Sequence, residues 1–317
     1  MLIFHKLADI PCDFGPTIVT VGNFDGVHRA HRAVLEEIVR RAQATHARSV
    51  VVTFEPHPAR ILRPDHTFKL LSPTPEKLRL LETTSVDAVF LLPFTRDLSL
   101  MTPHQFAHDI LKRHLHAREV HEGYNFHFGN KAEGNIQVLR KLGHEMGFEV
   151  HDYPEMRLRG ERVSSSHIRK LLSEGRASRA RHLLDRPFSI LSTPGRGRGY
   201  GAKYTVPTIN LARYEELVPR DGVYITRTRI GEECFDSVTN VGNRPTFGAD
   251  SFAIESHLLN FHPLQLSGET EVELHFLDRL RDEIKFPSIE ALKEQIGRDV
   301  RTAQSYLRRL ARISPRS

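Results

Sequence analysis

The stretch Thr20-Val-Gly-Asn-Phe-Asp-Gly-Val-His28-Arg-Ala-His31 decides how the first half of the chain is interpreted. The segment Thr17–Val21 begins just before this stretch and overlaps its first two residues. It is a short apolar run typical of a buried strand. Gly22–Arg29 then forms a short loop, after which apolar residues recur at the 3.6-residue helical period. These residues are Val34, Leu35, Ile38, Val39 and Ala42. The sequence therefore predicts a strand, a loop and a helix in immediate succession.

Two histidines, His28 and His31, stand three residues apart where the predicted strand hands over to the helix. Unpaired N–H groups at a helix start, together with the helix dipole, favour a bound phosphate there. Imidazoles on the first turn can donate hydrogen bonds to the same phosphate. Taken alone, the pair favours a simpler interpretation, in which two exposed polar residues open an ordinary surface helix.

The rest of the first half alternates predicted strands with helical segments. Further strands are expected at Arg48–Phe54, Ala88–Leu92 and Glu119–His121. Strands that alternate with helices predict a parallel sheet covered by helices on both faces.

The pattern changes near Arg186, beyond which apolar residues alternate at period two. The strands expected from this alternation are Gly222–Ile230, Cys234–Val241, Phe252–Phe261 and Thr270–Phe276. Turn sequences separate them, as in an antiparallel barrel or sandwich. A helix with one apolar face is expected to start at Pro287-Ser288. We place the domain boundary so that residues 1–184 form the first domain and 185–317 the second.

The composition suits a two-domain globular protein, because 317 residues exceed a typical single domain. The first ten residues, MLIFHKLADI, predict no signal peptide, and no apolar run approaches the roughly 18 residues of a membrane span. The two cysteines, Cys12 and Cys234, predict no disulfide framework and favour a reducing compartment. We therefore expect a cytoplasmic protein that has no membrane partner.

The net charge of +6 is spread along the chain rather than gathered in blocks. Such a surface attracts polyanions, either nucleic acid or small nucleotides. The absence of a long lysine/arginine tract favours the small ligand. The sequence leaves the oligomeric state open and slightly favours a monomer.

A glycine-rich segment, Gly195-Arg-Gly-Arg-Gly-Tyr-Gly201, is closely followed by Val206–Asn210. Glycines allow backbone N–H groups to approach phosphates closely. The same composition is typical of a flexible loop or of an Arg-Gly segment in a nucleic-acid-binding protein. The segment alone leaves these three interpretations open.

Histidines are also frequent in the middle of the first half. They are His104, His108, His114, His116 and His121. The first two have helical spacing, but no glutamate follows His104 as the zinc motif of zincins requires. We therefore expect a solvent-exposed helix face here rather than a zinc site.

The segment GNFDGVHRAH resembles the G-x-F-D-G-V-H-x-G-H signature of the FAD synthetase branch of the nucleotidyltransferase superfamily, with Ala30 where glycine is usual. Three further segments resemble motifs of that family. They are Thr53-Phe-Glu-Pro-His-Pro58, Gly123-Tyr-Asn-Phe-His-Phe-Gly129 and Ser164-Ser-Ser-His-Ile-Arg169. The resemblance implies that His28 and His31 are catalytic, because they bind the ATP phosphates and stabilise charge while pyrophosphate leaves. The implied phosphate-binding set is Gly22, Phe24, Asp25, Ser164, Ser165 and Arg169, and the implied flavin-binding set is Pro56, His57 and Asn125.

In the second half, Pro207-Thr-Ile-Asn210 resembles the P-T-A-N motif of riboflavin kinases. Three later segments resemble further motifs of that family. They are Gly242–Phe247, Ile254–Leu258 and Leu280–Phe286. The resemblance implies that Thr208 and Asn210 are ligands of Mg²⁺ and that Glu255 is the general base for the ribityl hydroxyl. The remaining implied roles are phosphate binding for Gly199 and Gly201 and flavin binding for Arg281.

Together, the two resemblances imply a Rossmann-like α/β nucleotidyltransferase domain, followed by a mainly antiparallel β-barrel of the riboflavin kinase type with a C-terminal helix. The implied reactions convert riboflavin and ATP to FMN and ADP, and then FMN and ATP to FAD and pyrophosphate. Mg²⁺ is the implied cofactor, and nucleic acid is not an expected partner. Two alternatives remain: an adenylyltransferase for another nucleotide-like acceptor with a non-catalytic barrel, or a nucleic-acid-binding protein that uses the glycine-rich loop and the basic surface.

Overall fold

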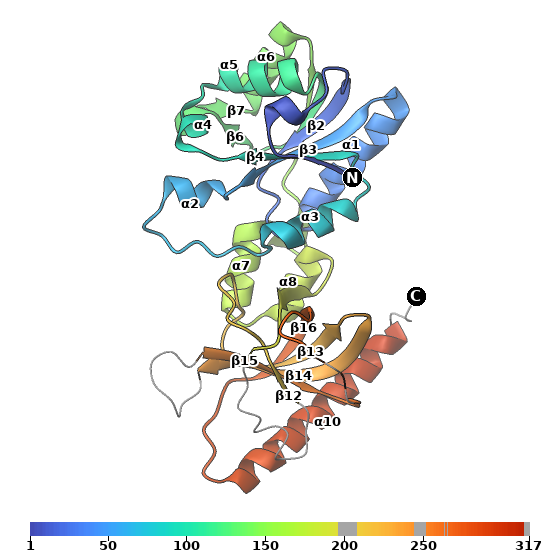
Figure 1. The fold of residues 1–317 in the computed structure, drawn as a ribbon, viewed down its shortest axis with the longest axis vertical. Helices are drawn as coiled ribbons and strands as arrows, with labels where there is room; N and C mark the ends of the chain where they lie inside the picture. Colours follow the sequence, from blue (N-terminus) through green and yellow to red (C-terminus); the bar gives the residue numbers. More distant parts are fainter. Residues whose placement is uncertain (196–207, 244–251, 263, 265, 314–317) are drawn as a thin grey trace. The chain divides into compact units, whose positions relative to one another are not determined.

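The computed structural model of the chain describes residues 1–195, 208–243, 252–262, 264 and 266–313. The glycines predicted to bind phosphate in the second half, Gly199 and Gly201, lie outside the described residues, as does most of the Gly242–Phe247 segment. The chain divides into two compact units, Met1–Ser165 and Ser166–Ser317, each with its own six-stranded sheet (Figure 1).

The first unit is built on a sheet in which all neighbouring strands are parallel. In spatial order the strands are β1 (Leu2–Phe4), β4 (Ala88–Pro93), β3 (Arg48–Glu55), β2 (Thr17–Val21), β5 (Ala117–Gly123) and β8 (Glu149–Tyr153). From β2 the chain adds β3 and β4 on one side, and then crosses back to add β5 and β8 on the other. The carboxyl ends of β2 and β5 therefore form a topological switch point, which is where sheets of this kind bind ligands.

Helices cover both faces of this sheet, as the sequence predicted. They are α1 (Arg29–Thr45), α2 (Pro58–Leu62), α3 (Thr74–Glu82), α4 (Arg96–Leu100), α5 (Pro103–Gln105), the π-helix η2 (Phe106–His114) and α6 (Ile136–Met146). Ile18 and Val51 face a core shared with α1 and α3, whereas Val19 and Val50 face a core shared with η2 and α6. Successive residues of a strand point to opposite faces, so each central strand contributes to both cores.

Short elements complete the first unit. They are η1 (Leu7–Asp9), η3 (Asn130–Ala132) and the strand pairs β6 (His127–Phe128) with β7 (Gly134–Asn135) and β9 (Arg157–Leu158) with β10 (Glu161–Arg162).

The second unit contains a curled antiparallel sheet. Its strands, in spatial order, are β11 (Phe188–Ser192), β16 (Val272–Arg281), β13 (Gly222–Ile230), β14 (Glu233–Asn243), β15 (Phe252–Leu258) and β12 (Thr208–Asn210). Its helices are α7 (Ser165–Ser173), α8 (Ala177–Leu184) and α10 (Ile289–Ile313). Pro194 and Leu211 form an antiparallel bridge just beyond the two edge strands, so the edges of the sheet meet there. The predicted fold class, an α/β unit followed by a mainly antiparallel barrel with a C-terminal helix, is confirmed.

The end of the first unit falls earlier in the chain than the boundary that we predict at 184/185. α8 contacts β11 and β16, and its side chains Ala177, Ala180, Leu183 and Leu184 are at most 2% exposed. By its contacts, α8 is therefore part of the second unit. The residue at which a functional second domain begins stays a prediction.

We expect a fragment of residues 166–317 to be more stable than one of residues 185–317. The shorter fragment loses the burial of Leu183 and Leu184 against the sheet, and each buried leucine contributes about 1.5–3 kcal/mol. Its free energy of unfolding should therefore be lower by at least about 3 kcal/mol. Urea unfolding followed by circular dichroism measures the difference, and equal unfolding free energies would show that α8 contributes nothing to the sheet.

The structure corrects one prediction about the histidine-rich stretch. His104, His108 and His116 are exposed, as expected for a solvated surface. His121 is only 1% exposed, because it lies on the central strand β5 rather than on a helix. The prediction of a solvent-exposed helix face is therefore wrong for His121.

Candidate functional site

The loop between β2 and α1 has an unusual backbone conformation at the switch point. Phe24, Gly26 and Val27 all have positive φ angles, of 48°, 80° and 35°. Such angles are unfavourable for residues other than glycine and persist only where the surroundings enforce them, as they often do at functional sites. Space is also tight, because a Cβ atom on Gly22 would lie 3.2 Å from the ring of Phe24.

His28 and His31 come together at the start of α1. His28 is the N-cap residue, and its Nδ1 accepts a hydrogen bond from the backbone N–H of His31 at 3.3 Å. The two rings stack with centroids 3.6 Å apart, and Phe24 packs against His31 at 4.9 Å. In neutral His28 the ring proton is therefore on Nε2, since Nδ1 is an acceptor.

Burial determines the charge state of His31. It lowers the pKa of His31 well below its usual value, and the neighbouring His28 lowers it further. His31 Nδ1 is buried and makes no hydrogen bond to any other described residue. His31 is therefore a neutral imidazole that stacks on His28 at a helix N-terminus, a position that suits a phosphate.

Asp25 supports the loop between β2 and α1 through buried hydrogen bonds. Its side chain is 2% exposed, and Oδ1 accepts the backbone N–H groups of Leu71 at 2.9 Å and Ser72 at 3.0 Å. The hydroxyl of Ser165 donates to the backbone carbonyl of Asp25 at 2.9 Å. Asp25 and Ser165, both predicted to bind phosphate, are thus joined to the histidine loop. The carboxylate of Asp25 is engaged in supporting it.

Lys77 is a supporting residue that the sequence patterns did not reveal. It is 5% exposed on α3, and its Nζ donates to Thr53 Oγ1 at 3.1 Å and to the carbonyl of Phe54 at 3.2 Å. Thr53 in turn donates to the carbonyl of Asn23 in the loop at 3.1 Å. Burial lowers the pKa of Lys77, although Glu55 and Asp25 oppose this shift.

Glu122 marks the place where β2 and β5 separate. The ladder between these strands ends at Val19 and Val120, and Glu122 Oε1 then accepts the backbone N–H of Val21 at 2.6 Å. Burial raises the pKa of Glu122 well above its usual value. A carboxyl side chain therefore replaces the strand pairing at the switch point. No sequence motif singled it out.

The residues predicted to bind flavin lie at the same carboxyl edge of the sheet. Pro56 follows β3, and His57 caps α2, where its Nδ1 accepts the N–H of Ala59 at 3.1 Å while its ring stacks on Phe68 at 4.4 Å. Asn125 is exposed in the turn after β5.

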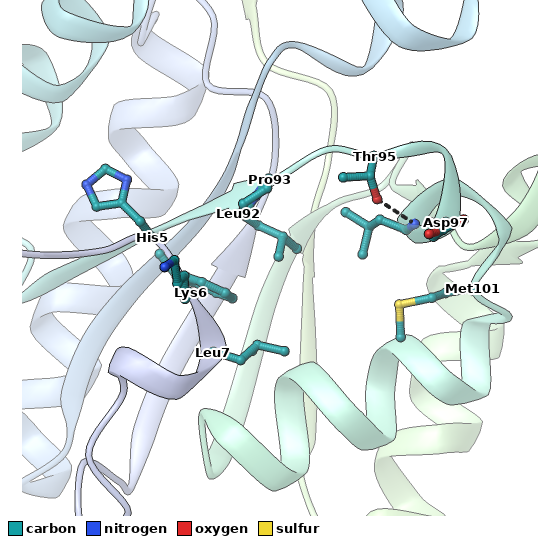
Figure 2. Close-up of a pocket in the computed structure, with 10 residues that line it drawn as sticks. His5, Lys6, Leu7, Leu92, Pro93, Thr95, Asp97 and Met101 are labelled. Carbon is teal, nitrogen blue, oxygen red and sulfur yellow. Dashed lines mark hydrogen bonds between the residues drawn. The ribbon is translucent and has the colours of Figure 1, made fainter.

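A pocket of about 380 Å³ opens at this edge, beyond β1 and β4 (Figure 2). Most of its lining is apolar, with Leu7, Phe90, Leu92, Pro93, Leu98 and Met101 among the side chains. Pro93 is the strand partner of Glu55, which immediately precedes Pro56. The pocket therefore adjoins one of the predicted flavin-binding segments, although no motif predicted the pocket itself.

The other predicted phosphate-binding residues are on or beside α7. Ser164 precedes this helix, and Arg169 lies within it, in the second unit. Both are half-buried. Their predicted roles stay predictions.

In the second unit, three predicted residues fall in one row across the sheet. Asn210 on β12 is the direct strand partner of Glu255 on β15, and Glu255 is the direct partner of Asn240 on β14. The row continues through Val223 on β13 to Arg281 on β16. Direct partners in an antiparallel pair project from the same face, so Asn210, Glu255 and Asn240 form a continuous polar strip.

Other polar groups extend this strip. Thr208 lies two residues from Asn210 and pairs with His257, whose pKa is lowered by burial. Asn240 donates from Nδ2 to Glu283 Oε1 at 2.8 Å. Arg281 is held by Asp299 of α10, with Nη2 and Oδ2 2.8 Å apart. Sequence reasoning missed Asn240, because a single asparagine within an alternating strand gives no signal.

The opposite face of the same strands holds β15 in place. Ser256, next to Glu255, is fully buried and contacts the hydroxyls of Thr228 and Thr239 at 2.8 and 3.1 Å. Because Ser256 is fixed inside the sheet, Glu255 must project from the other face. The prediction from alternation that Glu255 points away from the core is confirmed.

Comparison with known proteins gives two family matches. The FAD synthetase family matches residues 11–167, and the riboflavin kinase family matches residues 184–307. The chain is 32% identical to the bifunctional riboflavin kinase/FMN adenylyltransferase of Escherichia coli (strain K12), over 95% of this chain and 96% of that protein. Proteins of the same name from Haemophilus influenzae and Pseudomonas fluorescens are 33% and 34% identical, over 91% of this chain and 93% and 92% of theirs.

A solved structure also matches along nearly the whole chain. The crystal structure of a macrolide-efflux protein from Streptococcus pneumoniae superposes with a TM-score of 0.86 at 25% identity, covering 96% of this chain and 98% of that one. Within the described part of the present chain, none of the helices combines the length and apolar character needed to cross a membrane. The two family matches and the full-length relatives agree: the chain belongs to the family of bifunctional riboflavin kinase/FMN adenylyltransferases.

Proposed function

We propose that the chain makes FMN and then FAD at two separate sites, one in each unit. The observation that carries this proposal is the placement of the predicted residues. His28 and His31 meet at the switch point of the first sheet, and Asn210 and Glu255 are direct partners in the second. The two histidines lie in the first unit, and Asn210 and Glu255 lie in the second.

In the first unit, an oxygen of the FMN phosphate attacks the α-phosphorus of ATP, and the bond to pyrophosphate breaks. Both reactants are anions, so the protein orients them and neutralises charge. The Nε2–H of His28 and the ring of His31 face the phosphates at the start of α1, whose dipole also favours negative charge. The reaction requires no side-chain nucleophile.

The pocket beyond β1 and β4 is our candidate for the flavin ring. Its volume of about 380 Å³ and mostly apolar lining suit a flat aromatic group, and it lies at the same sheet edge as the histidine pair. Leu98 of α4 is one of the residues that line the pocket, and its backbone N–H donates to Thr95 Oγ1 at 3.1 Å. A ring bound here leaves its phosphate free to extend toward α1.

We expect Leu98→Trp to raise the KM for FMN in FAD synthesis by about tenfold or more, because the larger side chain occupies the pocket. Riboflavin phosphorylation should not change. Leu100→Trp is the matched control, since Leu100 lies on the same helix but is 53% exposed. Steady-state kinetics with varied FMN test this prediction, and an unchanged KM in Leu98→Trp places the flavin elsewhere.

In the second unit, the riboflavin hydroxyl attacks the γ-phosphorus of ATP, and ADP leaves. Glu255 is the base that orients this hydroxyl and accepts its proton. Asn210 and Asn240 lie on either side of Glu255 in the strip, where their amides position the reacting groups. Arg281, at the far end of the row, supplies a positive charge near the ligands.

The strip also fits a magnesium ion. Mg²⁺ prefers oxygen ligands, and Asn210 and Thr208 offer an amide and a hydroxyl oxygen on the same face of β12. These two residues would hold the ion, which supplies charge neutralisation for the transferred phosphoryl group. In support, Asn210 is the direct strand partner of Glu255, and Thr208 is the direct partner of His257, two residues farther along β15.

The direct test is to incubate the protein with riboflavin, ATP and Mg²⁺ and to separate the products. We expect FMN and ADP first, then FAD and pyrophosphate. If FAD forms only when FMN is supplied, the chain has the adenylyltransferase activity and lacks the kinase activity. We also propose that the protein acts in the cytosol, where ATP is abundant and where its two exposed free thiols, Cys12 and Cys234, stay reduced.

A further inference from the structure

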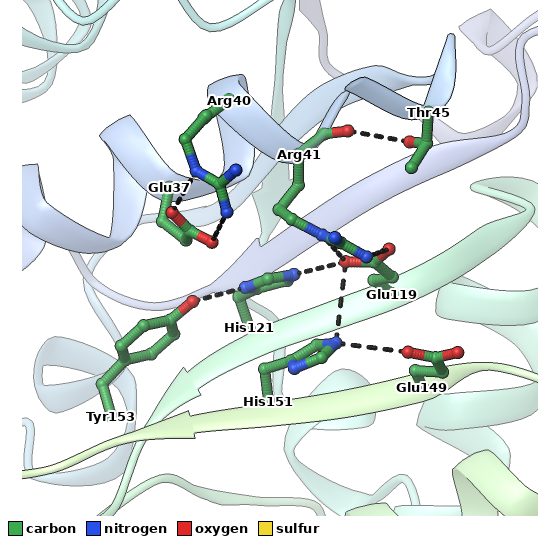
Figure 3. Close-up of polar contacts among 9 residues, drawn as sticks. All are labelled: Glu37, Arg40, Arg41, Thr45, Glu119, His121, Glu149, His151 and Tyr153. Atoms are coloured by element: carbon green, nitrogen blue, oxygen red, sulfur yellow. Dashed lines mark hydrogen bonds and ion pairs between the residues drawn. The ribbon is translucent and has the colours of Figure 1, made fainter. Parts of the chain in front are cut away.

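A second polar cluster lies in the first unit, on β5, β8 and α1 (Figure 3). Glu119 and His121 are two residues apart on β5 and so project from the same face, and His151 on the edge strand β8 is the direct partner of His121. Arg41 of α1 covers them from above. Arg41 lies 12 residues from the start of α1, which is about 18 Å along the helix axis from the phosphate end.

Three potential ligand atoms converge in this cluster. His121 Nε2 lies 2.9 Å and His151 Nε2 lies 3.6 Å from Glu119 Oε2. Each of the three residues offers a ligand atom that lies within 4.8 Å of a ligand atom of the other two. Ligand atoms around a tetrahedral zinc ion, with bonds of about 2.0–2.2 Å, are about 3.3–3.6 Å apart. The three atoms are therefore close to the positions that such an ion requires.

His151 and His121 each show a feature expected of a metal ligand. His151 Nε2 is enclosed and makes no hydrogen bond with the described residues, although carboxylate oxygens of Glu119 and Glu149 lie 3.6 and 3.4 Å away. The other ring nitrogen of His121, Nδ1, lies 2.7 Å from the hydroxyl of Tyr153. Histidine ligands commonly have such a partner on the second ring nitrogen, where it fixes the ring and its tautomer.

We propose that Glu119 Oε2, His121 Nε2 and His151 Nε2 bind a divalent transition-metal ion of the zinc type. Glu149 or a water molecule completes the coordination. In this bound state His121 carries its proton on Nδ1, and this N–H donates a hydrogen bond to the hydroxyl oxygen of Tyr153. The ion joins the edge strand β8 to the central strand β5.

The charge states of Glu119 and His121 suit this role. Burial alone would raise the pKa of Glu119, but its hydrogen bonds with Arg41 and His121 outweigh burial and lower the pKa to about 2. Burial lowers the pKa of His121 against the opposing effect of Glu119. At neutral pH the carboxylate is thus ionised and His121 is neutral, as metal binding requires.

Arg41 is the main opposing influence. It contacts both oxygens of Glu119, with Nη2 2.5 Å from Oε1 and Nε 2.9 Å from Oε2. Metal binding must loosen the contact with Oε2, while the contact with Oε1 persists. Two imidazole ligands nevertheless favour zinc-type ions strongly over Mg²⁺, so the magnesium that accompanies ATP does not compete for this site.

The test uses the full chain after treatment with a chelator, titrated with Co²⁺ in excess Mg²⁺. We expect one saturable equivalent with the visible absorption of a tetrahedral site, and Zn²⁺ should displace it. His151→Ala should weaken the binding at least about tenfold, and Tyr153→Phe, which keeps all three ligands, by about 10–100-fold. His108→Ala is the matched control, because His108 is an exposed histidine of the same unit.

A second readout separates this site from weak binding by other histidines. Zn²⁺ should raise the thermal unfolding midpoint of the wild type and of His108→Ala, but not that of His151→Ala. Wild-type protein that takes up no equivalent of Co²⁺ in the presence of Mg²⁺ overturns the proposal. So do His151→Ala and Tyr153→Phe variants that bind Co²⁺ as tightly as the wild type does.

Discussion

Replacing Glu255 by glutamine should reduce riboflavin phosphorylation by about 10²–10⁴-fold, because the general base is lost. Glutamine keeps the size of the side chain and can still hydrogen bond to neighbouring groups in the strip. The fold should persist as well, since the buried Ser256 and its hydroxyl partners hold β15 from the other face. Riboflavin affinity should therefore change little. FAD synthesis from supplied FMN should be unaffected, because that reaction belongs to the other unit.

Two assays on the same variant measure the effect, one for FMN formed from riboflavin and one for FAD formed from FMN. Glu233→Gln is the matched control, an isosteric change at the exposed start of β14. Kinase turnover within a few-fold of the wild type would make Glu255 an ordinary strand residue and would move the role of base to another group. Loss of both activities would point to a damaged fold, which circular dichroism detects.

His28→Asn should reduce FAD synthesis from FMN by about 10²–10³-fold while leaving riboflavin phosphorylation intact. Asparagine is chosen because His28 is the N-cap of α1 and accepts the backbone N–H of His31. An asparagine oxygen replaces that acceptor, whereas alanine removes it at a cost of about 0.5–2 kcal/mol in stability. The variant therefore removes the imidazole donor and keeps the helix start.

His28→Ala provides the comparison. If the imidazole acts on the phosphates, both variants lose FAD synthesis alike, and only His28→Ala also unfolds at lower urea concentration. Near-normal FAD synthesis in His28→Asn, and in His31→Ala as well, would contradict the assignment of the phosphate site.

Local pattern was sufficient to predict the central strands of both sheets. Thr17–Val21 and Gly222–Ile230 have the predicted bounds. The strands that were missed are mostly at the edges, as β1, β8, β11 and β12 are. These strands are only 3 to 5 residues long and take their conformation from hydrogen bonds to a distant partner, such as Leu2 with Ala88. Such long-range pairing leaves little trace in a local window of sequence.

The site was predicted unevenly for a similar reason. Motifs identified the histidine pair and Glu255, because their neighbours along the chain carry the signal. Lys77 and Glu122 act through distant partners, Thr53 and Val21, so nothing near them in the sequence indicates their burial. His121 was wrongly assigned to an exposed helix face although the predicted strand Glu119–His121 includes it, and its strand partner His151 is thirty residues away along the chain.

The most direct test of two separate sites in one chain is to mix the two variants. With riboflavin, ATP and Mg²⁺, Glu255→Gln alone should make almost no FMN or FAD, and His28→Asn alone should accumulate FMN. An equal mixture should make FAD, because FMN released by one variant is adenylylated by the other. The contradicting result is a mixture that accumulates FMN and makes no more FAD than the two variants do separately. If Glu255→Gln still adenylylates supplied FMN in that case, the two sites are not independent sites linked by free FMN.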